Sequence, residues 1–366
     1  MSFWVLFAID IILLVLVYYF VNKFALKKQG NVVKKREKLI NLLLVAFFVL
    51  FIVTMFLVVP PVDVVYSAIF SLEKICILAL ATTGIILIFR TSMTTNFAQG
   101  ILATLGSYFA SVILSNYLVD SGFPLWLVLT LAILAGALFS FVVGLLIDVI
   151  IIRNSKYPNP VSKQIITMGL VLAFTGLIPV VFTKPTEFYL LPPIATESLA
   201  INIFGYDKNI PMRIIYVTII TVAVLGTLFA ALRYTKWGLG VRATASNEMV
   251  AGMMGVNTRI ITALSWGIAG GLGALAAFFL AQQMTQLNPA FMINTQVNGF
   301  LASVLGSFNS FGGPIVGAII IQMLLSLLPN VEGLQIWASV VVYSLILLIV
   351  LLKPLGLFGK KITKKV

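Results

Sequence analysis

The chain contains no histidine, one cysteine and few charged residues, and each shortage removes a class of function. Without histidine there is no histidine metal site, Ser-His-Asp triad or histidine proton relay. The single cysteine, Cys76, rules out an internal disulfide framework, and its place in an apolar run indicates a small buried side chain. Charged residues form 10% of the chain, against roughly a quarter in soluble domains. No catalytic or metal-binding residue is predicted.

Apolar residues dominate the chain instead. They form 61% of its 366 residues, and the mean hydropathy is +1.11. Apolar runs of about 18 residues or more recur along the whole length, which is typical of a polytopic α-helical membrane protein. We therefore predict an all-α fold with about ten transmembrane helices. The expected spans are 3–21, 39–58, 74–90, 98–118, 124–152, 163–182, 211–232, 260–281, 295–328 (interrupted) and 334–352.

The net charge of +13 is distributed unevenly. Lysine and arginine gather in alternate connections, at 23–38, 153–163 and 233–259 and in the tail from Lys353. Because cytoplasmic loops are enriched in these residues, this pattern predicts a multi-pass protein of the cell membrane, in contact with membrane lipid. The N-terminus is then outside and the C-terminus cytoplasmic. The basic segments lack interleaved aromatic residues, so no nucleic-acid partner is predicted.

Two interruptions fall inside the apolar runs. A single helix over 295–328 would be about 50 Å long, against a hydrocarbon core of about 30 Å. Dividing it at "GSFNSFGGP" (306–314) into a broken or re-entrant pair removes the conflict. The stretch "NFAQGILATLGS" (96–107) resembles it in the first half of the chain. Paired interruptions of this kind predict an inverted-repeat core around a transport pathway.

The polar and small residues at these interruptions have two interpretations. Amides and hydroxyls could bind a zwitterion in transit, or they could satisfy backbone groups freed by the break. The glycines could belong to the pathway, or they could allow close helix packing. Candidate pathway residues are Asn96, Gln99, Gly100, Asn298, Ser303 and Ser307. Candidate glycines of the broken segments are Gly106, Gly306, Gly312, Gly313 and Gly317.

Two acidic residues fall within the expected spans. An ionisable residue inside a membrane is a functional candidate by default. Asp148, however, is expected at the cytoplasmic interface near Arg153, and Asp10 lies in the first span. We assign neither residue to the pathway.

The connection "KWGLGVRATASNEMVAGMMGVNTR" (236–259) is longer and more polar than a simple turn. Ser246 or Asn247 can cap a short helix, and Gly255 suits a left-handed stop. Ala251 and Gly255, four residues apart, would form a small face on that helix. The pattern indicates a short helix that docks into a groove of a cytoplasmic partner. A solvated connecting helix or an interfacial anchor remains an alternative.

Several motifs together resemble the permease subunits of ABC importers for branched-chain amino acids. "NFAQG" (96–100), "VLGSFNSFGGPIVGA" (304–318) and "LKPLGLFG" (352–359) follow in family order around the loop motif. The resemblance runs from about residue 74 to 359. In the loop, the matching residues are Gly240, Arg242, Ala243, Asn247, Ala251, Gly255, Val256 and Asn257.

The resemblance implies a division of labour among several proteins. Residues 61–366 would form the permease domain, with 233–259 as the loop that couples to cytoplasmic ABC ATPase subunits. Residues 1–60 would add two N-terminal transmembrane helices with a basic loop. A second permease subunit, identical or not, and an external substrate-binding protein would complete the importer.

The chain carries no Gly-x4-Gly-Lys-Ser/Thr phosphate loop of its own. No cofactor is therefore expected on this chain, and ATP and Mg²⁺ would be used by the partner ATPases. The chain is predicted to be a transport subunit and not an enzyme. Urea, amides or another small polar solute are alternative cargoes. A gradient-driven secondary transporter and a membrane scaffold without transport are the alternatives from other classes.

Overall fold

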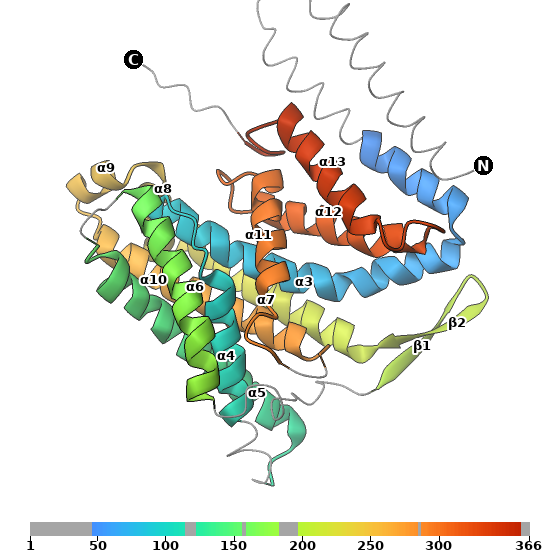
Figure 1. The fold of residues 1–366 in the computed structure, drawn as a ribbon, viewed down its shortest axis with the longest axis horizontal. Coiled ribbons are helices and arrows are strands. Elements are labelled where there is room, and N and C mark those ends of the chain that lie inside the picture. The colour runs from blue at the N-terminus through green and yellow to red at the C-terminus, as the bar shows by residue number, and fades with distance from the viewer. Residues whose placement is uncertain (1–45, 114–121, 156–158, 183–196, 285–286, 360–366) are drawn as a thin grey trace, which may run out of the picture. The chain divides into compact units, whose positions relative to one another are not determined.

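The structure is a computed structural model that describes residues 46–113, 122–155, 159–182, 197–284 and 287–359. The expected first span, Asp10 and the basic segment 23–38 lie outside these residues. The described part of the chain is mostly helical (Figure 1). Its helices are Ala46–Val58, α3 (Pro61–Ser92), α4 (Gln99–Ile113), α5 (Leu125–Leu146), the π-helical turn η2 (Ile147–Ile152), α6 (Pro160–Val181), α7 (Met212–Tyr234), α8 (Lys236–Ser246), α9 (Glu248–Met253), α10 (Thr258–Ala281), α11 (Ile293–Gly306), α12 (Gly313–Leu327), the 3₁₀ turn η3 (Leu328–Asn330) and α13 (Ala338–Leu352).

Six helices in the described residues are long and apolar enough to cross a membrane. They include α6, α7 and α10, whose ends lie within about three residues of the predicted spans. The expected run 295–328 is divided into α11 and α12, as predicted from its length. The polytopic helical class is thus confirmed. The total of about ten spans, the inverted repeat and the domain boundary at residue 60 stay predictions.

The helix α3 is longer than expected. The predicted span was 74–90, but the helix begins at Pro61, whose missing N–H suits a first helical position. It has 32 residues, or about 48 Å. The added part of the helix contains the acid Glu73. The structure shows why the helix tolerates this acid: Glu73 is buried and pairs with Arg213 of α7 at 2.8 Å.

A β-hairpin departs from the all-α prediction. Strands β1 (Ser198–Ile203) and β2 (Tyr206–Pro211) form a two-stranded sheet. Phe204 and Gly205 at the turn have φ angles of 51° and 85°, as the first and second positions of a type I′ turn require. The side chain of Asn202 accepts a hydrogen bond from the Gly205 N–H at 2.9 Å. Because Phe-Gly is an unusual pair for this turn, the sequence did not indicate a hairpin.

The chain forms two compact units. The first comprises Met1–Phe70, Ala200–Lys208 and Met323–Ser344. Within its described part, the side chain of Lys208 lies 3.3 Å from Asp63, in the first turn of α3. The Asn330 amide donates to the Ser67 hydroxyl at 2.8 Å. These contacts attach the hairpin and η3 to the beginning of α3.

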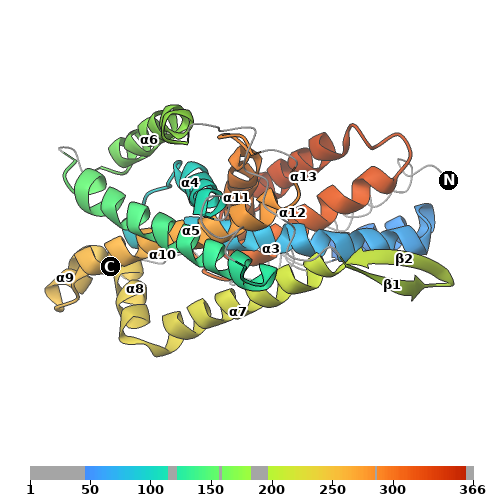
Figure 2. The same cartoon turned by 90° about the horizontal axis from the view of Figure 1, so that it is seen from below.

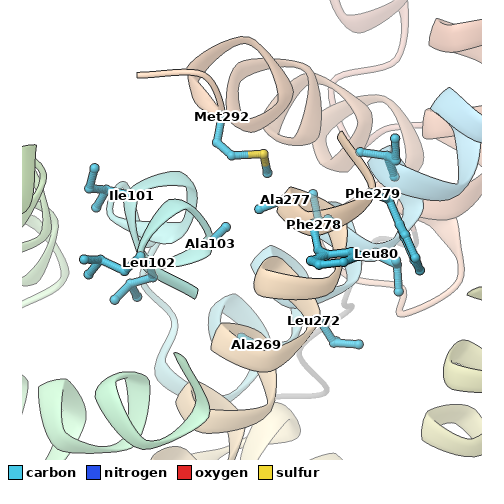
Figure 3. Close-up of a cluster of buried hydrophobic side chains, with 14 of the residues drawn as sticks. Leu80, Ile101, Leu102, Ala103, Ala269, Leu272, Ala277, Phe278, Phe279 and Met292 are labelled. Atoms are coloured by element: carbon cyan, nitrogen blue, oxygen red, sulfur yellow. The ribbon is translucent and has the colours of Figure 1, made fainter. Parts of the chain in front are cut away.

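The second unit comprises Ser71–Leu199, Asn209–Gln322 and Leu345–Val366, and α10 lies at its centre. This helix packs most extensively against α5 and α4. Glycines allow the close approach: a Cβ at Gly144 of α5 would lie 2.5 Å from the Trp266 carbonyl oxygen, and one at Gly270 of α10 would lie 2.3 Å from the Ser140 carbonyl oxygen. Figure 3 shows the core, in which Ala103 lies on the side of α4 that faces α10.

Candidate functional site

The first interruption lies between α3 and α4. The chain leaves α3 at Ser92 and begins α4 at Gln99. The Gln99 amide donates to the carbonyl of Ala269 at 2.7 Å, and Ala269 is in the middle of α10. A Cβ on Gly84 of α3 would also lie 2.8 Å from the Gln99 amide nitrogen. The start of α4 therefore lies beside Gly84, which is eight residues, or about 12 Å, back from the end of α3 at Ser92. It also lies halfway along α10, one of the helices long enough to span a membrane.

The backbone freed at this interruption is satisfied by side chains. The side-chain oxygen of Asn96 accepts a hydrogen bond from the Ala98 N–H at 2.9 Å, and its amide nitrogen donates to the side-chain oxygen of Gln99 at 3.3 Å. The Phe97 N–H donates to the Thr167 hydroxyl of α6 at 3.2 Å. Buried backbone groups need such partners. These contacts match the interpretation in which the amides replace lost helical hydrogen bonds.

Gln296 of α11 links the first interruption to the second broken segment. Its carbonyl oxygen accepts from the Gly100 N–H at 2.7 Å, and its amide donates to the Phe97 carbonyl. One side chain thus bonds backbone groups on both sides of the start of α4. This residue was not among those predicted from the sequence. The signal was present in "NTQVNG" (294–299), where amides recur at every second position, but only Asn298 was selected from it.

The second interruption lies between α11 and α12. Ser307, directly after α11, has a φ of 96°, a region that residues other than glycine rarely occupy. Its N–H donates to the Ser303 carbonyl at 2.9 Å, and its hydroxyl accepts from the Asn309 N–H at 3.2 Å. The Gly313 N–H donates to the Ser310 hydroxyl at 3.1 Å, at the start of α12. Local hydroxyls therefore hold this interruption in one conformation.

The "LKPLGLFG" motif closes the end of α11. The Leu357 N–H donates to the Leu305 carbonyl at 2.7 Å, and the Phe358 N–H donates to the Gly306 carbonyl at 3.4 Å. The last carbonyls of a helix have no partners within it, so these bonds complete the helix end. Gly356 has a φ of 77°, and a Cβ there would lie 2.6 Å from the Val304 carbonyl oxygen. Only glycine fits this close crossing.

The glycines of the broken segments mostly serve close packing. A Cβ on Gly306 would lie 2.0 Å from the Gly313 carbonyl oxygen, and one on Gly317 would lie 2.2 Å from the backbone of α11. Gly312 differs, because a Cβ there would meet no atom within 4 Å. In the first broken segment, a Cβ on Gly100 would lie 2.3 Å from the side-chain oxygen of Gln296, and one on Gly106 would lie 2.3 Å from the Ser140 hydroxyl.

The predicted pathway residues are all buried within the chain. Most of their hydrogen bonds described above go to backbone groups, and one joins the side chains of Asn96 and Gln99. The Ser303 hydroxyl, for example, donates to the Gly299 carbonyl of its own helix at 2.8 Å. A role in the pathway remains a prediction for this set. The buried members are Asn96, Gln99, Gly100, Asn298, Ser303 and Ser307.

The loop 233–259 is almost entirely helical, and its first helix is fixed at two points. Figure 2 shows α7 leading into α8, which turns away from it, and α9 leading on to α10. The Arg242 guanidinium donates to the Leu232 carbonyl at 2.7 Å and to the Arg233 carbonyl at 3.2 Å, so it caps α7. A Cβ on Gly240 would lie 2.7 Å from the Ile261 side chain. Two residues of the loop motif therefore hold α8 against α7 and α10.

The ends of α9 agree with the predicted caps. Asn247 is the N-cap, and its side chain accepts from the Val250 N–H at 3.1 Å. Gly255 follows the helix with a φ of 85°. The Val256 N–H donates to the Ala251 carbonyl at 3.0 Å, the long bond of a Schellman motif. Both the start and the stop of this short helix are thus specified by the sequence.

The predicted small face of this helix is wrong. The helix ends at Met253, so Gly255 lies beyond it, and Ala251 is only 5% exposed. Ala251 points into the chain because its small side chain allows close packing there. The exposed side carries four larger apolar residues instead, which we call the methionine face. Its members and their exposed fractions are Met249 (72%), Val250 (51%), Met253 (78%) and Met254 (80%).

Helices long and apolar enough to span a membrane, interrupted apolar runs and a capped helical loop are together typical of a membrane transport protein. The family model of the permease component of branched-chain amino acid transport systems matches residues 67–351. The chain belongs to this family. It is a permease subunit of an ABC importer of the branched-chain amino acid type, and it is a transport protein, not an enzyme.

Curated relatives agree with the family match. The chain is 23% identical over 295 residues to the high-affinity branched-chain amino acid permease LivH of Escherichia coli K12, covering 79% of this chain and 93% of LivH. It is 24% identical over 292 residues to BraD of Pseudomonas aeruginosa, with the same coverage. It is 26% identical over 323 residues to LsrC, an autoinducer 2 import permease of Escherichia coli O9:H4, covering 86% of each chain. No solved structure matches the chain.

Proposed function

We propose that this chain forms the membrane route for branched-chain amino acids in an ATP-driven importer. The observation that carries the proposal is the start of α4 at Gln99, bonded to the middle of α10. Interrupted helices that begin at this depth are found where a substrate crosses the membrane, because only a route or surrounding protein can satisfy their freed backbone.

The chemistry of this region suits an amino acid. The N-terminus of α4 carries the partial positive charge of a helix end, which favours a carboxylate. The carbonyl oxygens of Asn96, Gln99 and Gln296 can accept hydrogen bonds from an ammonium group. The surrounding α3 and α10 side chains are mostly apolar, as a branched side chain requires. We expect these amides to exchange backbone partners for substrate when the route opens.

Energy would come from cytoplasmic ABC ATPase subunits that use ATP and Mg²⁺. Their proposed contact is the methionine face of α9, because exposed methionines adapt to a partner's groove. The basic residues of 233–259 and of the tail favour a cytoplasmic place for both, which puts the N-terminus outside. An external binding protein would deliver substrate, and a second permease subunit would complete the pore.

Reconstitution tests the proposed function. The full chain is placed in proteoliposomes with its ATPase subunits, a sister permease and the external binding protein, and radiolabelled leucine is the probe. Uptake is expected only when ATP is present on the side of the membrane that carries the ATPase subunits and the binding protein is present on the opposite side. Uptake that follows an ion gradient and ignores ATP would establish the secondary-transporter alternative.

The cargo needs a comparison of its own. LsrC shows that a similar permease belongs to an autoinducer 2 system. Competition of leucine uptake by valine and isoleucine, but not by urea or acetamide, is the expected result. Equal competition by amides would favour the alternative cargo.

Gln99→Leu is expected to lower leucine uptake at least about ten-fold. The substitution keeps the volume of the side chain but removes the amide proposed to meet substrate at mid-membrane. ATPase association and binding-protein association should stay unchanged, because Gln99 lies inside the membrane core of the chain. Uptake per mole of assembled complex is the measurement.

Gln164→Leu is the matched control for this variant. Gln164 makes the same kind of bond, donating to the Thr95 hydroxyl at 2.7 Å, but we do not place it in the route. Gln164→Leu removes one hydrogen bond and Gln99→Leu removes two, and each buried group left without a partner costs about 1–3 kcal/mol. A similar loss of uptake in both variants would return Gln99 to a purely structural role.

A further inference from the structure

Four polar groups meet where α5 ends and α10 begins. Asp148, in the π-helical turn η2 after α5, is 4% exposed. Its carboxylate lies 2.8 Å from the guanidinium of Arg153, and the same guanidinium nitrogen donates to the Arg259 carbonyl at 2.7 Å. The Thr262 hydroxyl lies 3.3 Å from the Asp148 carboxylate and 3.1 Å from the Arg259 carbonyl, and its single proton can be donated to either. We call this set the α5–α10 bridge.

The π-helical turn is what allows the bridge to form. Residues five apart in an α-helix lie about 140° apart around the axis, so Asp148 and Arg153 would diverge. In η2 the Arg153 N–H instead donates to the Asp148 carbonyl at 3.0 Å, which is the bond between residues five apart. This winding brings both side chains to the face that meets α10. Such turns are frequent at functional sites.

The bridge is attached to the loop that we propose to dock on the ATPase. Asn257 caps α10 and accepts from the Ile260 N–H at 3.3 Å, so the Arg259 carbonyl belongs to the first helical turn. Only a few residues separate it from Met253, the end of α9. Within that short link, the Val256 N–H donates a hydrogen bond to the Ala251 carbonyl at 3.0 Å. A displacement of α9 must therefore move the first turn of α10, and with it the bridge.

Close packing already holds α5 to α10 without these charges. The crossings at Gly144 and Gly270 bring the two backbones together along their length. The Asp148 side chain is 5% exposed and that of Arg153 is 30% exposed, and such a partly exposed ion pair adds little net stability, because the buried carboxylate loses its hydration while solvent screens the guanidinium. What the ion pair adds is one defined geometry between the two helix ends. Stability alone thus does not account for it.

We propose that the α5–α10 bridge transmits the movement of the docking loop to α5, so that ATP hydrolysis opens the route only when the bridge is intact. Asp148 and Arg153 act as positioning residues in this device. The inference rests on the proposed docking of α9. It adds that the cytoplasmic end of α5 moves as one piece with the first turn of α10 during each cycle.

The test is the coupling ratio, measured as leucine molecules taken up per ATP hydrolysed by the reconstituted importer. Asp148→Asn is expected to lower this ratio about five-fold or more, a typical size for coupling between sites. The amount of assembled complex and its basal ATP hydrolysis should stay within about two-fold of the natural protein. A purely structural role would lower the amount of complex and leave the ratio unchanged.

Two further variants keep the test decisive if Asp148→Asn does not assemble. The double variant Asp148→Leu/Arg153→Met leaves no buried charge and is expected to fold, yet it lacks the bond to the Arg259 carbonyl. Its coupling ratio should also fall about five-fold or more. The exchange Asp148→Arg/Arg153→Asp should restore part of the natural value. Arg259→Ala is the control, because only the backbone carbonyl of Arg259 takes part in the bridge. The coupling ratio of this variant should equal that of the natural protein.

An unchanged coupling ratio in Asp148→Leu/Arg153→Met would overturn the proposal. The proposal would also be overturned if Arg259→Ala lowered the coupling ratio as much as Asp148→Asn does. Failure of the natural chain to bind an ATPase or to take up leucine with ATP would instead refute the proposed function. The two failures are therefore distinct.

Discussion

The double variant Met253→Glu/Met254→Glu is expected to lose its ATPase subunits and its leucine uptake. Both side chains are about four-fifths exposed, at 78% and 80%, and we place them at the centre of the contact. A hot-spot side chain at the centre of an interface contributes about 2 kcal/mol or more, so the loss of even one of these two contacts should lower retention of the ATPase about thirty-fold. Co-purification of the ATPase with the tagged permease, followed by uptake in proteoliposomes, measures both effects.

The fold should survive this substitution, since exposed positions change stability by about 0.5 kcal/mol or less. Phe204→Glu is the matched control: Phe204 is 69% exposed at the turn of the hairpin, away from the 233–259 loop in sequence. It should retain the ATPase fully. Full retention in the methionine variant as well would refute docking through this face.

Ala251→Glu answers a different question from these variants. Because Ala251 is buried, a carboxylate there would have to enter the packed side of α9. Loss of transport in that variant would report a damaged loop and not a blocked contact. The methionine face therefore gives the cleaner test of docking.

Arg213→Met is expected to destabilise the permease by about 3–5 kcal/mol. Glu73 is 3% exposed, and its two oxygens lie 2.8 Å and 3.2 Å from the Arg213 guanidinium. Removing one partner of a buried ion pair leaves the other charge without compensation. The free energy of unfolding in detergent, or the thermal midpoint at fixed detergent concentration, measures the loss.

Two variants check this explanation. Glu73→Leu/Arg213→Met removes both charges and should recover stability to within about 1 kcal/mol of the natural chain. Lys208→Met breaks the pair with Asp63, whose side chains are 32% and 44% exposed, and should cost about 1 kcal/mol or less. Equal losses in Arg213→Met and Lys208→Met would show that the burial of Glu73 is unimportant.

The sequence predicts the helical membrane class because apolar runs report directly on burial in lipid. It also predicts the division of 295–328, since one helix of that length does not fit the membrane, and the caps of α9, since Asn247 and Gly255 act on their own neighbours. Each of these features depends on local chemistry. The first part of α3, residues 61–73, was missed because the partner of Glu73 is 140 residues away in the chain.

The face of α9 could not be predicted for a similar reason. Which side of a short helix is exposed depends on what it packs against, and a six-residue helix contains too few turns to show a pattern. Gln296 was missed because its two backbone partners lie almost 200 residues earlier. The amide repeat at 294–298 marks this stretch as polar, but it does not indicate which of the three amides reaches the distant backbone.

The bonds from Leu357 and Phe358 to the end of α11 set an order of events during membrane insertion. The carbonyls of Leu305 and Gly306 receive these partners only after about 50 further residues have been synthesised, and α13 comes before them in the chain. Since proteins fold from the N-terminus as they are made, the α11–α12 pair must enter the bilayer unfinished. Completion of the permease is then a late step. A ribosome that stalls within α13 would leave a subunit in which the Leu305 and Gly306 carbonyls, at the end of α11, lack their hydrogen-bond donors.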